Sequence, residues 1–224
     1  MPFSLASTHC MSNKMNKLFI IGLPRTGTTS ISVALLEHDF MVAHTAFTKR
    51  AFELADVVSD APCFSDYKEL DAIFPGSKFV YLDRDLDSWI LSIQMLLKKM
   101  EQRLDPVTGV FSPVLKRSFN EVFALTSTED PHAREHLEAC YLKHKKEVFD
   151  YFSERDDLLS INLSHENSLT ALLEFLGIEV KENKQFPHLN IGRHVAGWKE
   201  FKHPNKVNAN SAGVEQRKFF NYKK

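Results

Sequence analysis

The sequence predicts an α/β protein in three layers, with helices flanking a central parallel sheet. Three observations support this fold class. Short apolar runs at residues 17–22, 78–83 and 158–162 are typical of parallel strands that are buried on both faces. A glycine turn and a helical pattern follow the first run, and this order is the opening unit of an α/β sheet. The length of 224 residues suits a single domain, and 18 Phe supply ample apolar area for its core.

The other elements are predicted from the spacing of apolar residues and from breakers. Helices are expected over residues 28–36, 47–58, 66–74, 85–104 and 169–176, and a further short strand over residues 57–64. Pro75-Gly76 ends the third of these helices, and Gly177 ends the last. Ser112-Pro113 and Asp130-Pro131 each place an N-cap residue before a proline, so two more helices start there, the second running to about Phe152. These helices form a helical insertion in the second half of the chain.

Composition divides the chain into three parts. Residues 1–16 are expected to be a flexible leader, residues 17–186 a single α/β domain, and residues 187–224 a basic C-terminal segment. The net charge of -1 excludes a general nucleic-acid binder, which usually shows a strongly basic balance. It also hides an asymmetry, because residues 187–224 hold eight Lys and Arg against two Glu. A basic segment attached to an acidic body suits a lid over a phosphorylated nucleotide.

The cysteines and the N-terminus predict a location. Cys10, Cys63 and Cys140 form no CxxC pair, which fits a reducing compartment and offers no disulfide framework. No apolar run approaches the roughly 18 residues of a membrane span, and the first residues lack the charged-then-apolar order of a signal peptide. We therefore expect a cytoplasmic protein without membrane association.

Residues 22–29 read G-L-P-R-T-G-T-T, which is the frame of a phosphate-binding loop between a strand and a helix. In this frame the backbone N–H groups of a tight turn and a helix N-terminus converge on an anion. Gly22 and Gly27 permit the turn and the close approach of a ligand. Thr28 replaces the lysine that reaches the β- and γ-phosphates of ATP, and Arg25 is the only cation in the loop. The sequence therefore predicts an oxyanion site on a P-loop-type fold rather than an ATPase.

At this loop the sequence resembles the sulfotransferases that use 3′-phosphoadenosine 5′-phosphosulfate (PAPS), whose loop typically reads P-[KR]-[ST]-G-T-T. In that family an Arg at a strand end and a Ser eight residues later bind the 3′-phosphate, and Arg84 and Ser92 have this spacing. The neighbouring residues 74–79 and 87–89 look like the bacterial branch of the family. The resemblance implies that the 5′-phosphosulfate is held by Arg25, Thr26, Gly27, Thr28 and Thr29, with Ser30 completing the first helical turn beside them.

The family's C-terminal segment, R-K-G-x-x-G-x-W-K, contacts the 3′-phosphate as a lid. Residues 192–199 read G-R-H-V-A-G-W-K, which lacks the Lys-Gly pair and is one residue shorter in its spacing. Arg193 is therefore the candidate 3′-phosphate ligand of this segment.

The resemblance implies transfer of a sulfuryl group from PAPS to a hydroxyl or amine by in-line displacement. Arg25 would meet the charge that develops on the bridging oxygen, and a base would deprotonate the acceptor. Family members place that base either as His in T-H-x-P after a later strand or as Glu shortly after the first helix. Asp60, in S-D-A-P, occupies the first position and His44 lies near the second. Both remain candidates.

Two other functions stay open: a P-loop nucleotide kinase or other phosphotransferase, and a non-catalytic protein that binds the desulfated product (PAP) or another nucleotide. No metal is expected for sulfuryl transfer, because the sulfonate carries less charge than a γ-phosphate. His132, His136, Cys140 and His144 recur every four residues, but they drift about 40° per step, so all four cannot meet one ion and their helix is expected to be structural. The acceptor is expected to be a small molecule or a glycan, walled by the helices of residues 105–155. The sequence does not determine its identity or the oligomeric state.

Overall fold

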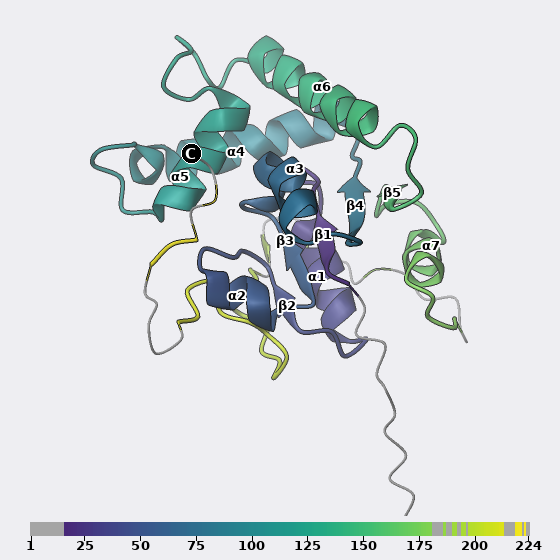
Figure 1. Ribbon diagram of the computed structural model, residues 1–224. Coiled ribbons are helices and arrows are strands. Elements are labelled where there is room, and N and C mark those ends of the chain that lie inside the picture. Colours follow the sequence, from purple (N-terminus) through teal and green to yellow (C-terminus); the bar gives the residue numbers. More distant parts are fainter. Residues whose placement is uncertain are drawn as a thin grey trace, which may run out of the picture.

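The fold is built on one parallel sheet. The computed structural model describes residues 16–180, 186, 190–191, 194–195, 197–212, 218–220 and 222. Five parallel strands lie in the order β2-β3-β1-β4-β5 (Figure 1). They are β1 (Leu18–Ile20), β2 (Val42–Ala43), β3 (Val57–Ser59), β4 (Lys78–Leu82) and β5 (Leu158–Ile161). The predicted α/β class with a central parallel sheet is confirmed.

Helices connect these strands. They are α1 (Thr28–Leu36), α2 (Lys49–Leu54), α3 (Cys63–Ile73), α4 (Leu86–Leu104), α5 (Pro113–Phe123), α6 (Arg134–Tyr151) and α7 (Ser168–Phe175). A short antiparallel pair, β6 (Asn190–Ile191) and β7 (His194–Val195), lies outside the main sheet. Among the described residues, no helix combines the length and apolarity that a bilayer span demands.

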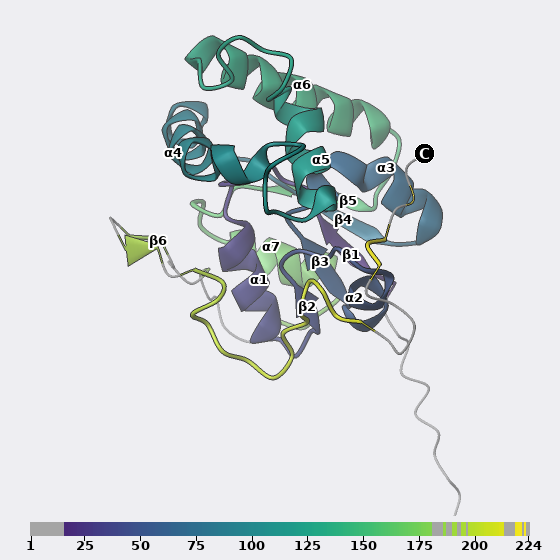
Figure 2. The same ribbon diagram turned by 90° about the vertical axis from the view of Figure 1, so that its left-hand side faces the viewer.

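Alternating strand residues bury the sheet on both faces, which produces the three layers (Figures 1 and 2). Leu18 and Ile20 face one way and pack with residues of α1 and α7. Phe19 and Ile21 face the other way and pack with residues of α2, α3 and α6. The continuous apolar runs in the sequence thus reflect two cores on opposite sides of one sheet.

The helical insertion lies between β4 and β5 and comprises α4, α5 and α6, which share a third apolar core (Figure 2). The predicted start of α5 is confirmed, since the Ser112 hydroxyl accepts from the Leu115 N–H. The predicted start of α6 at Pro131 is wrong, because α6 begins at Arg134. Asp130 instead closes a turn, in which its carboxylate accepts from the His132 N–H and its carbonyl from the Ala133 N–H.

Two boundaries around the edge of the sheet also differ from the prediction. The helix expected over residues 47–58 is the six-residue α2, and α3 begins earlier than expected, at Cys63. The two-residue β2 was not predicted, because a strand this short leaves no periodic signal. It gains order from the C-terminal segment: the Val42 N–H donates to the Asn205 carbonyl at 2.9 Å, and the Val207 N–H donates to the Val42 carbonyl at 2.8 Å.

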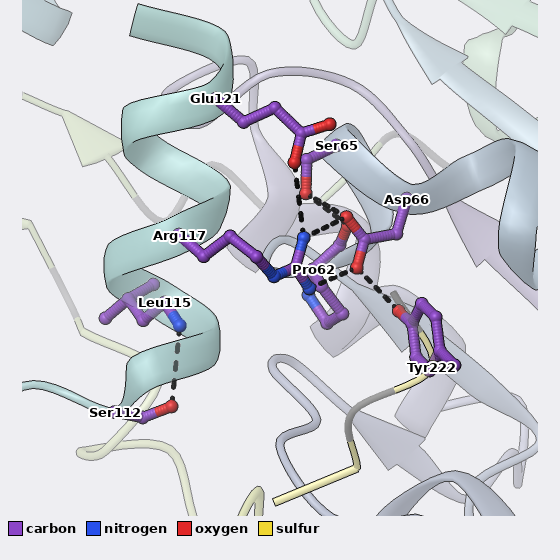
Figure 3. Close-up of polar contacts among 8 residues, drawn as sticks. All are labelled: Pro62, Ser65, Asp66, Ser112, Leu115, Arg117, Glu121 and Tyr222. Atoms are coloured by element: carbon purple, nitrogen blue, oxygen red, sulfur yellow. Dashed lines mark hydrogen bonds and ion pairs between the residues drawn. The ribbon is translucent and has the colours of Figure 1, made fainter. Parts of the chain in front are cut away.

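Near its end, the chain is tied to the body of the protein at Asp66, a buried carboxylate in α3 (Figure 3). Arg117 of α5 donates to both Asp66 oxygens, at 2.9 and 2.7 Å, and the Tyr222 hydroxyl donates to one of them at 2.7 Å. Burial alone would favour the neutral acid, but hydrogen bonds from Arg117, Ser65 and Tyr222 lower the pKa of Asp66. The network therefore holds a charged carboxylate that links α3, α5 and Tyr222.

Because His144 is buried, we expect the free energy of unfolding to decrease in mild acid. Its Nε2–H donates to the Phe64 carbonyl at 2.7 Å, and burial lowers its pKa from 6.5 to about 4. Between these pH values His144 is protonated in the unfolded chain and neutral in the folded chain. The free energy of unfolding therefore falls as the pH drops through this window. We expect His144→Gln, which cannot titrate, to lose about 2 kcal/mol less stability than the wild type between pH 7 and pH 5.

Urea unfolding at the two pH values measures this difference. The control is His165→Gln, which makes the same replacement at an exposed histidine. Equal losses of stability in His144→Gln and wild type would contradict the prediction.

Candidate functional site

The predicted phosphate loop lies at the carboxyl end of the central strand β1 and leads directly into α1. A Cβ at Gly22 would lie 2.6 Å from the Leu82 Cβ, so no larger residue fits there. Gly27 has a φ of 111°, in the region that favours glycine. As the N-cap of α1 it offers no side chain, and the first turn of α1 contains no acidic residue. The N–H groups at this helix end therefore suit an anionic ligand.

Helix α4 braces this loop from the side. The indole N–H of buried Trp89 donates to the Pro24 carbonyl at 2.9 Å. One turn further along α4, the Ser92 hydroxyl accepts from Nε of Arg25 at 2.8 Å. Within the loop, the Thr26 hydroxyl donates to the Leu23 carbonyl at 2.7 Å. Arg25 and Ser92, which the resemblance assigned to opposite ends of one nucleotide, therefore lie within hydrogen-bonding distance.

Arg84 follows β4 and is held in place by α6. Its N–H donates to the Tyr141 hydroxyl at 3.0 Å, and that hydroxyl donates to the Asp83 carboxylate at 2.6 Å. Lys145 donates to the other Asp83 oxygen at 2.6 Å. The Arg84 guanidinium itself donates to the Arg25 carbonyl and to the Ser88 hydroxyl. The helical insertion thus fixes the position of the second cation of the site.

The two candidate bases lie near the start of α1, after β2 and β3, the two strands on one side of β1. Asp60 follows β3, and its carboxylate accepts from the Thr28 hydroxyl at 3.2 Å and from the Ala61 N–H at 2.8 Å. His44 follows β2, and its Nε2 lies 3.0 Å from the Thr29 hydroxyl oxygen. The chain thus brings both candidates to adjacent threonines of the phosphate loop.

The electrostatics of the site favour an anionic ligand. Burial lowers the pKa of Arg25, and the neighbouring Asp60 opposes this shift. Burial also lowers the pKa of Arg84, and the positive charge of Arg25 adds to the effect. Two partly buried guanidinium groups that disfavour each other's charge are stabilised by an anion between them. Burial likewise lowers the pKa of His44, which keeps its imidazole neutral.

These residues line one cavity of about 530 Å³. The predicted residues that border it are Arg25, Thr26, Gly27, Thr28, Thr29, Ser30, His44, Asp60, Arg84 and Ser92. Every strand of the sheet contributes at its carboxyl end, where ligands of parallel α/β sheets bind. Arg193 lies outside the described residues, so its assignment to the 3′-phosphate stays a prediction.

The sequence reasoning missed several residues of the cavity. Asn162 and Ser164 follow β5, and Ser88 precedes Ser92 by one helical turn. The strand-end rule would have found Asn162, because the strand over residues 158–162 had been predicted. Leu91 and Met95, which are 62% and 65% exposed, form an apolar rim on α4. No sequence signal separates such a rim from an ordinary solvent-facing position.

The histidines of α6 do not form a metal site. His136 Nε2 bonds to the Phe123 carbonyl at 2.8 Å, and His144 Nε2 to that of Phe64 at 2.7 Å. Across the described part of the chain, no three His, Cys, Asp or Glu side chains are grouped so as to hold a metal ion. Cys63 and Cys140 are buried free thiols.

A glycine loop that joins a central parallel strand to a helix, with Arg25 in the loop and Arg84 beside it, is typical of α/β proteins of the P-loop type. Comparison with protein families makes this specific. The sulfotransferase domain family matches residues 42–195, more than half of the chain, so the protein belongs to this family. The matched region contains His44, Asp60, Arg84 and Ser92 and begins after the phosphate loop. A search of curated proteins found no match.

Proposed function

We propose that this protein transfers a sulfuryl group from PAPS to a hydroxyl or amine acceptor. The main support for this proposal is that two arginines, Arg25 and Arg84, border one cavity. In this proposal Arg25 and the N-terminus of α1 bind one anionic group, and Arg84 and Ser92, which border the same cavity, bind a second. A nucleotide with a 5′-phosphosulfate and a 3′-phosphate presents two anionic groups to match them.

The residues fit such a donor in size and chemistry. The cavity volume of about 530 Å³ lies in the ordinary range of small-molecule sites. Hydroxyls of Thr28, Thr29, Ser88 and Ser92 add uncharged donors around the two arginines. The Ser92 hydroxyl accepts from Arg25, so its own O–H can donate to the 3′-phosphate.

The proposed step is an in-line displacement at sulfur. A bond forms between the acceptor oxygen or nitrogen and sulfur, while the bond from sulfur to the bridging oxygen breaks and PAP leaves. Arg25 stabilises the charge on the departing oxygen. The acceptor proton passes to a base, and we assign this role to His44. Burial lowers the pKa of its imidazole, which keeps the ring neutral and able to accept a proton.

Calorimetric titration tests the donor. We expect PAP to bind in the micromolar range without metal and adenosine 5′-monophosphate to bind at least about 10-fold more weakly, because it lacks the charge that Arg84 and Ser92 would meet. Arg84→Ala should weaken PAP binding by about 10- to 100-fold and bring it near that of the monophosphate.

Two results would contradict the proposed donor. One is the absence of PAP binding in the micromolar range. The other is tighter, Mg²⁺-dependent binding of ATP, which would favour a phosphotransferase. The control variant is Arg103→Ala in α4, whose guanidinium stacks on Phe111 away from the cavity. PAP binding by this variant should equal that of the wild type.

A further inference from the structure

The C-terminal segment of residues 198–207 contacts His44, the proposed base. The Trp198 ring stacks on the His44 ring with centroids 5.3 Å apart and an interplanar angle of 29°. The Nε2 atom of the same imidazole lies 3.0 Å from the Thr29 hydroxyl oxygen. The imidazole plane is therefore set from one side by Trp198, while Nε2 is directed at the N-terminus of α1.

Lys206 fixes Trp198 in this position. Its ammonium group donates to the carbonyls of Trp198 and Phe201 and lies 4.3 Å from the centre of the Trp198 ring. These contacts close residues 198–206 into a loop around one cation. A cation above an indole face is attracted to the negative face of the ring. The orientation of Trp198 therefore depends on Lys206.

The same loop is joined to the strand that carries His44. Lys206 pairs with Val42 as a parallel bridge, and both backbone groups of Val42 bond to the segment, at 2.9 and 2.8 Å. His44 lies two residues beyond Val42, and its carbonyl accepts from the Ser59 hydroxyl at 3.2 Å. One segment thus holds both the backbone before His44 and the ring of His44. Figure 2 shows this segment in yellow, passing beside β2.

Two charged groups face His44 from the elements packed around it. Asp60, after β3, raises the pKa of the imidazole, and Lys206, from the C-terminal segment, lowers it. Burial is the largest influence and also lowers it. Thr29 of α1 and Trp198 are uncharged. Lys206 therefore opposes protonation of the same ring that it helps to orient.

We infer that Trp198 and Lys206 are positioning residues for His44, and that the C-terminal segment takes part in acceptor activation. This inference rests on the proposed function. It extends the role of the segment beyond the covering of a nucleotide, since its described residues contact the base position and the edge strand β2.

Titration of His44 by NMR tests the inference without any turnover, and His44→Gln assigns the signal among the ten histidines. We expect Lys206→Met to raise the midpoint of the His44 titration, because a nearby positive charge is removed. Lys206→Arg, which keeps the charge, should leave the midpoint in place. Lys202→Met is the matched control, because Lys202 is exposed on the same segment. A midpoint that is the same in Lys206→Met and wild type would overturn the electrostatic role.

Turnover tests the orienting role. Trp198→Ala should lower kcat by about 10- to 100-fold with little change in KM for the donor, because a displaced base affects the chemical step rather than nucleotide binding. Trp198→Phe should retain most of the activity, since it keeps an aromatic face. Equal kcat in Trp198→Ala and wild type, or an equal loss in Trp198→Phe, would overturn it. Failure of the wild type to bind PAP would instead contradict the proposed function. The effect of Lys206→Met on the His44 titration could still be measured, because that experiment requires no bound nucleotide.

Discussion

Replacing Arg25 with Ala should lower kcat for sulfuryl transfer by at least roughly 10²–10³-fold, the usual cost of removing one donor to a developing oxyanion. Arg25 is the only cation of the phosphate loop, and it borders the cavity beside the N-terminus of α1. Its φ of 73° is unusual for a residue with a Cβ. Alanine also has a Cβ and keeps this backbone strain, so the variant should unfold at nearly the wild-type temperature.

The measurement is steady-state kinetics together with thermal unfolding. Arg50→Ala is the matched control, because Arg50 is an exposed arginine of α2 that pairs with Glu53 at 3.3 Å. Arg25→Lys should recover only part of the loss, since an ammonium group cannot reproduce the planar fork that donates to Ser92. Turnover by Arg25→Ala at the wild-type rate would remove Arg25 from the mechanism.

Replacing His44 with Gln should lower kcat by about 10²–10⁴-fold and abolish the acidic limb of the pH profile of kcat/KM. The base must be unprotonated, so this limb in the wild type reports the pKa of His44, which burial places below its ordinary value. Asp60→Asn should cost less activity, because an asparagine can still accept from the Thr28 hydroxyl.

Two charged neighbours of His44, Asp60 and Lys206, shift this acidic limb in opposite directions. Asp60 raises the pKa of His44, so Asp60→Asn should move the acidic limb to lower pH. Removal of Lys206 should move it the opposite way, because Lys206 lowers that pKa. A large loss in Asp60→Asn together with a nearly unaffected His44→Gln would assign the base to Asp60 instead.

Much of the fold could be predicted from the sequence, because its determinants are local. Strands β1, β4 and β5 coincide with apolar runs of consecutive residues, and helix α5 follows directly on its N-cap residue, Ser112. The errors arose where a distant partner decides the structure, as at β2, or where one residue suits two local structures, as at Asp130. Strand β2 exists through its pairing with β3 and with residues 205–207. Asp130 could cap a helix or close a turn, and its side chain closes a turn before α6.

The candidate site shows the same division. The sequence by itself determined the phosphate loop and the residue types around it, since Gly22, Gly27 and Arg25 lie within a few positions of one another. Only the tertiary structure decided that Arg25 meets Ser92, that Asp60 and His44 bond to adjacent threonines, and that Trp198 stacks on His44. The physical reason is that parallel strands bring their carboxyl ends to one edge of the sheet. Residues far apart in the chain therefore meet there, and no local pattern records which side chains will touch.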